Sequence, residues 1–171
     1  NHHSLEFWQQ LGFSTVTLSP ELSLTEIKQL TALEQPTQET IVYGYLTMMI
    51  SEYCPIGAVE RKFDFSQSCS GNCEDRNYGL LDRKGMTEAI EVDSDNCRSI
   101  IYNSQPLHLL NYLDEIRKSG CENIRLNFTI EAEEEIVKII EDYQRKLANP
   151  NQKIRSSIKD YTTGHFYRGV K

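Results

Sequence analysis

The stretch TVTLSPELSLTEIKQLTALEQPTQETIVYG, residues 15–44, decides the fold class. Residues 15–18 are β-branched or apolar and predict a short buried strand, and residues 40–44 predict a second strand. Between the two strands, Ser23 opens a capping box with the glutamate three positions on, which predicts a helix over about 24–34. Strand, helix and strand joined by short connections indicate the βαβ unit of a parallel sheet.

The flanking segments extend this pattern. Apolar spacing predicts a helix over residues 4–11. Ser104 is a candidate N-cap for a helix that would run to Gly120, and residues 124–128 predict a third core strand. Glutamates at 131 and 133–135 suit the first turn of a last helix. The expected buried stripe of this last helix comprises Ile136, Val137, Ile139, Ile140, Tyr143 and Leu147.

Residues 45–103 interrupt the alternation and contain four of the five cysteines. Within them, residues 78–81 and 86–92 are β-prone and are joined by Asp-Arg-Lys-Gly at 82–85. An aspartate at the first turn position and a glycine at the last indicate a hairpin with a type I turn and a bulge. Another short strand is expected over 98–102.

Three parallel-type strands cannot close a barrel, so the simplest fold is an incomplete one. We expect an α/β fold that forms the C-terminal part of a TIM-like (β/α) barrel, with a Cys-rich β-hairpin insertion, in a chain cut from a longer protein. The insertion would follow the carboxyl end of a strand, where such barrels place their active sites. The expected domains are 1–44 (the last-but-one βα units), 45–103 (the insertion), 104–147 (the final αβα) and 148–171 (a C-terminal tail).

The composition excludes several classes of protein. The chain has 171 residues, 39% of them hydrophobic, and no apolar run of the roughly 20 residues that span a bilayer. Neither a secretory signal nor a membrane partner is expected, which favours a cytoplasmic protein. The net charge of −7 argues against a free-standing nucleic-acid binder. The segment from Asn151 onward is nevertheless basic, and a solvated tail is favoured there over an anion-contacting one.

Cysteines supply the clearest candidate site. Cys54, Cys69, Cys73 and Cys97 lie inside the insertion, and a shared metal site is favoured over four unrelated thiols. Both structural zinc and an iron–sulfur cluster accept four thiolates, so the residues leave the two open. Cys121 lies outside the insertion and is expected to be a small buried side chain.

Other positions are weaker candidates, and each has a plain structural alternative. Glu21, Arg98 and His165 are the candidate catalytic residues, and the four histidines show neither a protease triad pattern nor His-Glu-x-x-His. Arg98 could equally be a surface charge, and Glu21 could equally be a helix-entry acid. The candidate substrate-binding residues are Arg83, Lys84, Tyr167 and Arg168, together with Tyr161. For Arg83 and Lys84 the alternative is a plain hairpin turn. For the terminal residues the alternative is a tail that packs onto the domain.

Six short motifs then occur in order, and together they carry a family resemblance. They are SPEL (19–22), YGY (43–45), EYCPIG (52–57), DRKG (82–85), NSQPL (103–107) and GHFYRG (164–169). With these motifs the chain resembles the collagenase-like peptidase family U32 over almost its full length. It is most similar to the members that hydroxylate cytidine in ribosomal RNA.

This resemblance implies hydroxylation without oxygen, acting on ribosomal or transfer RNA. It implies a four-iron–four-sulfur cluster held by Cys54, Cys69, Cys73 and Cys97, with prephenate as the source of the hydroxyl group and zinc as the alternative metal. The N-terminal remainder of the protein is an implied partner. The alternative functions are a collagenase-like peptidase and a non-catalytic module stapled by zinc. If the chain takes part in RNA hydroxylation, it is part of an enzyme.

Overall fold

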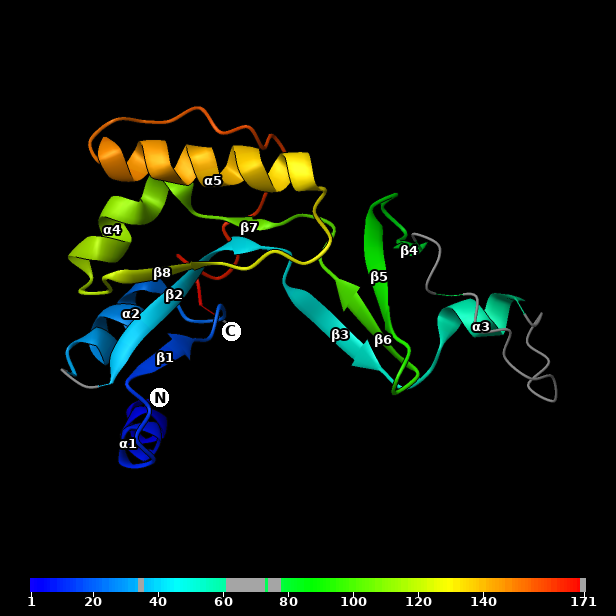
Figure 1. Cartoon of the computed structure of the whole chain (residues 1–171), viewed down its shortest axis with the longest axis horizontal. Coiled ribbons are helices and arrows are strands. Elements are labelled where there is room, and N and C mark those ends of the chain that lie inside the picture. The colour runs from blue at the N-terminus through cyan, green and yellow to red at the C-terminus, as the bar shows by residue number, and fades with distance from the viewer. Residues whose placement is uncertain (34–35, 61–72, 74–77, 170–171) are drawn as a thin grey trace. The chain divides into compact units, whose positions relative to one another are not determined.

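The computed structural model describes residues 1–33, 36–60, 73 and 78–169 (Figure 1). The chain divides into two compact units, each with its own sheet. The first unit combines Asn1–Gly44 with Pro106–Lys171, and the second is Tyr45–Gln105. The Cys-rich segment is therefore a unit inserted between two parts of the first.

A parallel sheet forms the centre of the first unit. Its strands are β1 (Thr15–Leu18), β2 (Thr37–Gly44) and β8 (Asn123–Leu126). Strand β2 lies between the other two, because its residue Glu39 pairs in parallel with both Thr17 of β1 and Asn123 of β8 (Figure 1). A short strand, β7 (Leu107–His108), pairs antiparallel with the carboxyl end of β2.

Helices α1 (His2–Gln10), α2 (Leu24–Thr31) and α5 (Glu133–Ala148) lie close to the predicted positions. The capping box of α2 is confirmed. The Ser23 amide donates to Glu26 Oε2 at 2.8 Å, and the Glu26 amide donates to Ser23 Oγ at 3.4 Å. Helix α2 ends at Thr31, three residues short of the prediction.

The helix predicted from Ser104 to Gly120 is wrong over its first half. Strand β7 occupies that region, followed by the 3₁₀ helix η1 (Leu110–Tyr112) and α4 (Leu113–Lys118). The reason is that the backbone amides of residues 108 and 109 donate to other segments and not to a preceding helical turn. The Leu109 amide donates to Val42 O on β2 and the His108 amide donates to Thr162 O in the C-terminal tail, both at 2.9 Å.

The predicted buried stripe of α5 is also partly wrong. Val137 and Leu147 are exposed, whereas Asp142 and Lys146 are buried beside Ile139 and Tyr143. Burial of Lys146 is possible because its three ammonium hydrogens meet three acceptors, which are Asp114 Oδ2 and the carbonyl oxygens of residues 150 and 152. Polar partners from the tail thus decide which side of α5 is buried.

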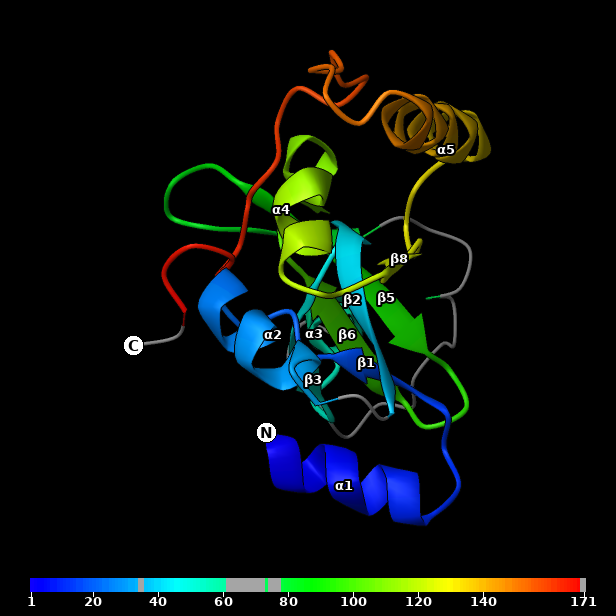
Figure 2. The same cartoon turned by 90° about the vertical axis from the view of Figure 1, so that its left-hand side faces the viewer.

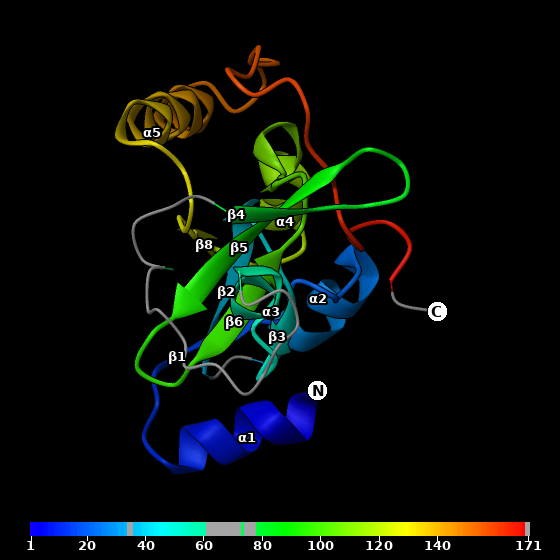
Figure 3. The ribbon, with the colours of Figure 1, turned by 90° about the vertical axis from the view of Figure 1, so that its right-hand side faces the viewer.

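The second unit is an antiparallel sheet in the order β3-β6-β5-β4 (Figure 3). The predicted hairpin is confirmed: the Gly85 amide donates to Asp82 O at 3.1 Å, and Gly85 has a φ of +80°. Across the described residues the fold is therefore mixed α/β, with one largely parallel and one antiparallel sheet and no closed barrel. The elements are β3 (Thr47–Ser51), α3 (Pro55–Glu60), β4 (Tyr78–Leu81), β5 (Thr87–Asp93) and β6 (Arg98–Tyr102).

Of the helices in the described ranges, none combines the length and apolar character that crossing a membrane requires.

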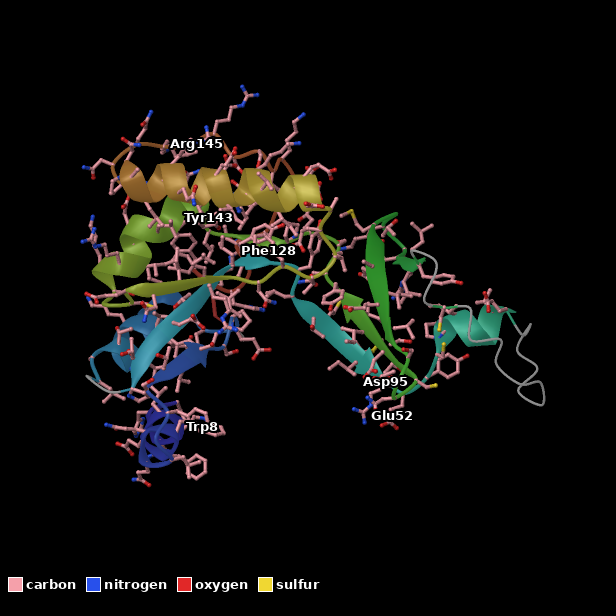
Figure 4. All side chains as sticks on the ribbon, viewed as in Figure 1. Trp8, Glu52, Asp95, Phe128, Tyr143 and Arg145 are labelled. Carbon is pink, nitrogen blue, oxygen red and sulfur yellow. The ribbon has the colours of Figure 1, made fainter. Side chains whose placement is uncertain are left out.

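A buried histidine connects the sheet of the first unit to α5 and the tail. His108 is 2% exposed, and its Nε2 lies 2.8 Å from Ser156 Oγ. Tyr143 points from α5 toward the sheet (Figure 4), and its hydroxyl donates to Val42 O at 2.7 Å. Since that proton is used, we assign the proton of His108 to Nδ1, which lies 3.3 Å from the Tyr143 oxygen, and Nε2 then accepts from Ser156. Burial lowers the pKa of His108 to about 4, so the imidazole is neutral at pH 7.

The first prediction concerns pH. Burial lowers the pKa of His108 to about 4, against a partial opposing effect of Asp142. The unfolded histidine titrates near 6.5, so between these values the unfolded chain binds a proton that the folded chain does not. The free energy of unfolding should fall by on the order of 3 kcal/mol as the pH drops through this window. Urea unfolding of the native chain and of His108→Gln at several pH values in this window measures the loss. An equal pH dependence of the unfolding free energy in both proteins would contradict the prediction.

The second prediction concerns Gly44. Its φ is +146°, and a Cβ there would lie 2.3 Å from Asn127 O, whereas a Cβ at Gly12, with a φ of +88°, would meet nothing within 4 Å. Gly12→Ala should cost about 1 kcal/mol of unfolding free energy from backbone strain alone. Gly44→Ala should cost at least about 2 kcal/mol more because of the clash with the Asn127 backbone, directly after β8. Thermal unfolding of both variants checks this, and equal losses would show that the close approach is not needed.

Candidate functional site

Cys54 lies between β3 and α3 and is half-buried. Its Sγ accepts a hydrogen bond from the Gly57 amide at 3.2 Å. A backbone amide that donates to sulfur is a hydrogen bond that also supports cysteines ligated to metals. Pro55 begins α3 directly after the thiol, and it suits the first helical position because it has no amide hydrogen to satisfy.

Cys97 occupies the end of the turn between β5 and β6. It is exposed and has a φ of +51°, the only non-glycine with a positive φ among the described residues. This left-handed backbone costs a residue with a Cβ on the order of 1 kcal/mol or more. Asn96 steadies the turn through two hydrogen bonds to the Asp93 carboxylate, at 2.9 and 3.3 Å. A strained backbone at a candidate ligand is a reason to suspect a functional role.

The other two candidate ligands are less well defined. Cys73 is half-buried, and Cys69 lies outside the described residues. Across the part of the chain that the structure describes, no three His, Cys, Asp or Glu side chains form a group able to hold a metal ion. The donor chemistry of Cys54 fits a thiolate-bound metal, and the convergence of the four thiols stays a prediction.

Cys121 is a different kind of cysteine, and it is buried as expected. Its Sγ lies 3.1 Å from Thr40 Oγ1 and 3.3 Å from Asn123 O, between β2 and β8. Burial raises the pKa of this thiol, which keeps it neutral. Cys121 therefore has the character of a core side chain in the first unit.

Charged candidates in the second unit lie on its surface. Arg98 pairs with Glu52, with Nη2 3.3 Å from Oε1, and both side chains are largely exposed. Arg83 and Lys84 are exposed in the hairpin turn, whose geometry Asp82 fully explains by accepting from the amides of residues 84 and 86. Nothing in these contacts assigns these residues a chemical role.

In the first unit, Glu21 is exposed after β1, while the terminal candidates belong to a tail that packs onto the domain. The Tyr167 hydroxyl lies 3.1 Å from both oxygens of Glu115, and desolvation followed by this hydrogen bond raises the pKa of Tyr167 to about 12. His165 Nδ1 lies 3.1 Å from the backbone oxygen of Gly169, and Arg168 is exposed. The packed-tail alternative accounts for these contacts.

The structure also reveals a pair that the sequence did not indicate. Ser156 Oγ and His108 Nε2 have the separation of a nucleophile and its base, although 48 residues separate them in the chain. The group at Nδ1, however, is the Tyr143 hydroxyl, because the Asp142 carboxylate binds Ser157. With the pKa of His108 near 4 and no carboxylate at Nδ1, this imidazole resists the protonation that a catalytic base must undergo.

Comparison with known proteins identifies the family. The tRNA hydroxylation protein P of Escherichia coli (strain K12) is 29% identical over 112 residues, which cover 65% of this chain and 23% of that protein. Its name refers to transfer RNA, whereas the likeness expected from the sequence was to members that act on ribosomal RNA. The search of solved structures found no match. The model of peptidase family U32 matches residues 1–169, so the chain belongs to peptidase family U32.

Proposed function

We propose that this chain is part of an RNA hydroxylase and that its inserted unit holds the metal cofactor. The observation that carries the proposal is the similarity to a tRNA hydroxylation protein over 65% of the chain. Because the match spans only about a quarter of that relative, the activity belongs to a longer assembly of which this chain supplies two units. Transfer RNA is the first substrate to test and ribosomal RNA the second.

Cys54, Cys69, Cys73 and Cys97 would hold a four-iron–four-sulfur cluster, which when bound supplies the electron-transfer chemistry that no side chain offers. The amide of Gly57 would stabilise one ligand through its hydrogen bond to Cys54. The turn hydrogen-bonded by Asn96 would position Cys97 as a second ligand, directly before β6. Prephenate is a candidate source of the hydroxyl group, and zinc is the alternative metal.

The finer fold proposal is that the first unit is a segment of a larger (β/α) barrel. Among the described strands, β1 and β8 each pair only with β2, so each presents one unpaired edge. An unpaired edge can accept another strand, which the remainder of a longer protein would supply. This arrangement favours a chain that needs the rest of the protein for turnover.

Because the family is named for peptidases, a peptidase activity is the alternative function. Ser156 with His108 is the nucleophile–base pair that the described structure offers for it, and the neutral, carboxylate-free environment of that imidazole argues against it. Gelatin cleavage that Ser156→Ala abolishes would overturn the hydroxylase proposal.

The third prediction tests the metal site. After anaerobic purification, the chain should contain about four irons with matching sulfide. Cys54→Ser and Cys97→Ser should each lower the iron content severalfold and remove the visible absorbance, because an incomplete thiolate set holds the cluster poorly.

Cys121→Ala is the matched control, and it should retain the iron because this thiol lies in the core of the first unit. Full iron in Cys54→Ser would contradict the assignment. One zinc per chain, with no iron, would instead favour the zinc-stapled module. Mass spectrometry of transfer and ribosomal RNA from cells with and without the longer protein then identifies the substrate.

A further inference from the structure

The segment after α5, residues 149–169, forms a strap that is bound along the first unit. Figure 2 shows it running from the end of α5 past α4 toward α2. Asn111 binds it twice at Ile154, donating to the backbone oxygen at 3.2 Å and accepting from the amide at 3.1 Å. Ser157 donates to Asp142 Oδ2 through its amide at 2.6 Å and its hydroxyl at 2.8 Å. These bonds hold the strap at successive points.

Exposure alternates along the bound strap. Ile154, Ser156 and Ile158 are half-buried, and the residues between and beside them are exposed. A period of two is that of extended chain, in which successive side chains lie on opposite sides and side chains two residues apart lie on the same side, about 6.6 Å apart. The exposed side of the strap carries Lys153, Arg155 and Lys159, which we call the basic row.

The basic row has no carboxylate partner among the described residues, where the ion pairs involve other side chains. Asp160 is the only acid in the strap. Three exposed cations within seven residues, without a carboxylate partner among the described residues, contrast with a chain whose net charge is −7. The strap therefore concentrates positive charge in one region of the surface of an acidic protein. Such a region attracts an anionic polymer.

We infer that the basic row is a contact surface for the sugar–phosphate backbone of RNA. Three closely spaced positive charges suit the repeated phosphates of a polyanion better than they suit the surface of an acidic protein. Prior anchoring of the strap backbone reduces the ordering cost that a free tail would incur on binding. Tyr161, half-exposed with its ring 5.1 Å from that of His108, follows the row and offers an aromatic surface at its end. The inference rests on the proposed function for its choice of RNA.

The test compares two variants with the same charge change. The strap variant is Lys153→Gln, Arg155→Gln and Lys159→Gln together. The control variant is Lys28→Gln, Lys118→Gln and Lys138→Gln, which removes three exposed lysines from α2, α4 and α5. Binding of unmodified transfer RNA and of a single-stranded RNA oligomer is measured by fluorescence anisotropy at several salt concentrations.

The strap variant should lose about 2 from the slope of log K against log salt for the oligomer, since each phosphate contact contributes about 0.7. This corresponds to about 100-fold weaker binding near 0.1 M salt. The control variant should bind like the native chain. Equal slopes in the native chain and the strap variant, or equal losses in both variants, would overturn the inference. Tighter binding of an acidic peptide than of RNA would do so too.

Cys54→Ser separates this inference from the proposed function. Loss of the cluster should leave RNA binding and its salt slope unchanged, because the strap belongs to the first unit. Strap-dependent RNA binding without a cluster or hydroxylation would refute the proposed function alone. The opposite outcome is also possible: the native chain holds the cluster and hydroxylates RNA, while the strap variant binds RNA as tightly as the native chain. That result would refute the inference about the basic row and leave the proposed function standing.

Discussion

The carboxyl end of β2 is the constraint on which the first unit depends. Val42 O accepts from both the Leu109 amide and the Tyr143 hydroxyl, and Tyr43 O accepts from the Asn127 amide. Three segments far apart in the chain thus satisfy two neighbouring carbonyl groups. Buried carbonyls without partners would be costly, so this end of β2 fixes where β7, α5 and the end of β8 must lie.

Buried polar groups extend the same constraint into the tail. Lys146, Asp142 and His108 are all nearly inaccessible to solvent, and each has a hydrogen-bond partner in the tail. Burying such groups is favourable only when their hydrogen bonds are met. The tail is therefore part of the core's hydrogen bonding, and the basic row becomes a fixed feature of the surface.

The two units divide the functional features between them. The inserted unit carries four cysteines, with an amide hydrogen bond to the sulfur of Cys54 and a left-handed backbone at Cys97. The first unit carries the parallel sheet and the strap, and its one cysteine is a core residue.

By itself the sequence determined the elements whose signals are local. The capping box at Ser23, the turn at Asp82–Gly85 and strands β1, β6 and β8 follow from neighbouring residues, and the structure confirms them. The cysteine set could be proposed from the sequence, but its geometry could not. Only the tertiary structure decided that residues 107–108 form a strand, that Val137 is exposed and that Lys146 is buried. The physical reason is that apolar periodicity records which residues avoid water, whereas these outcomes depend on hydrogen-bond partners supplied by segments distant in the chain.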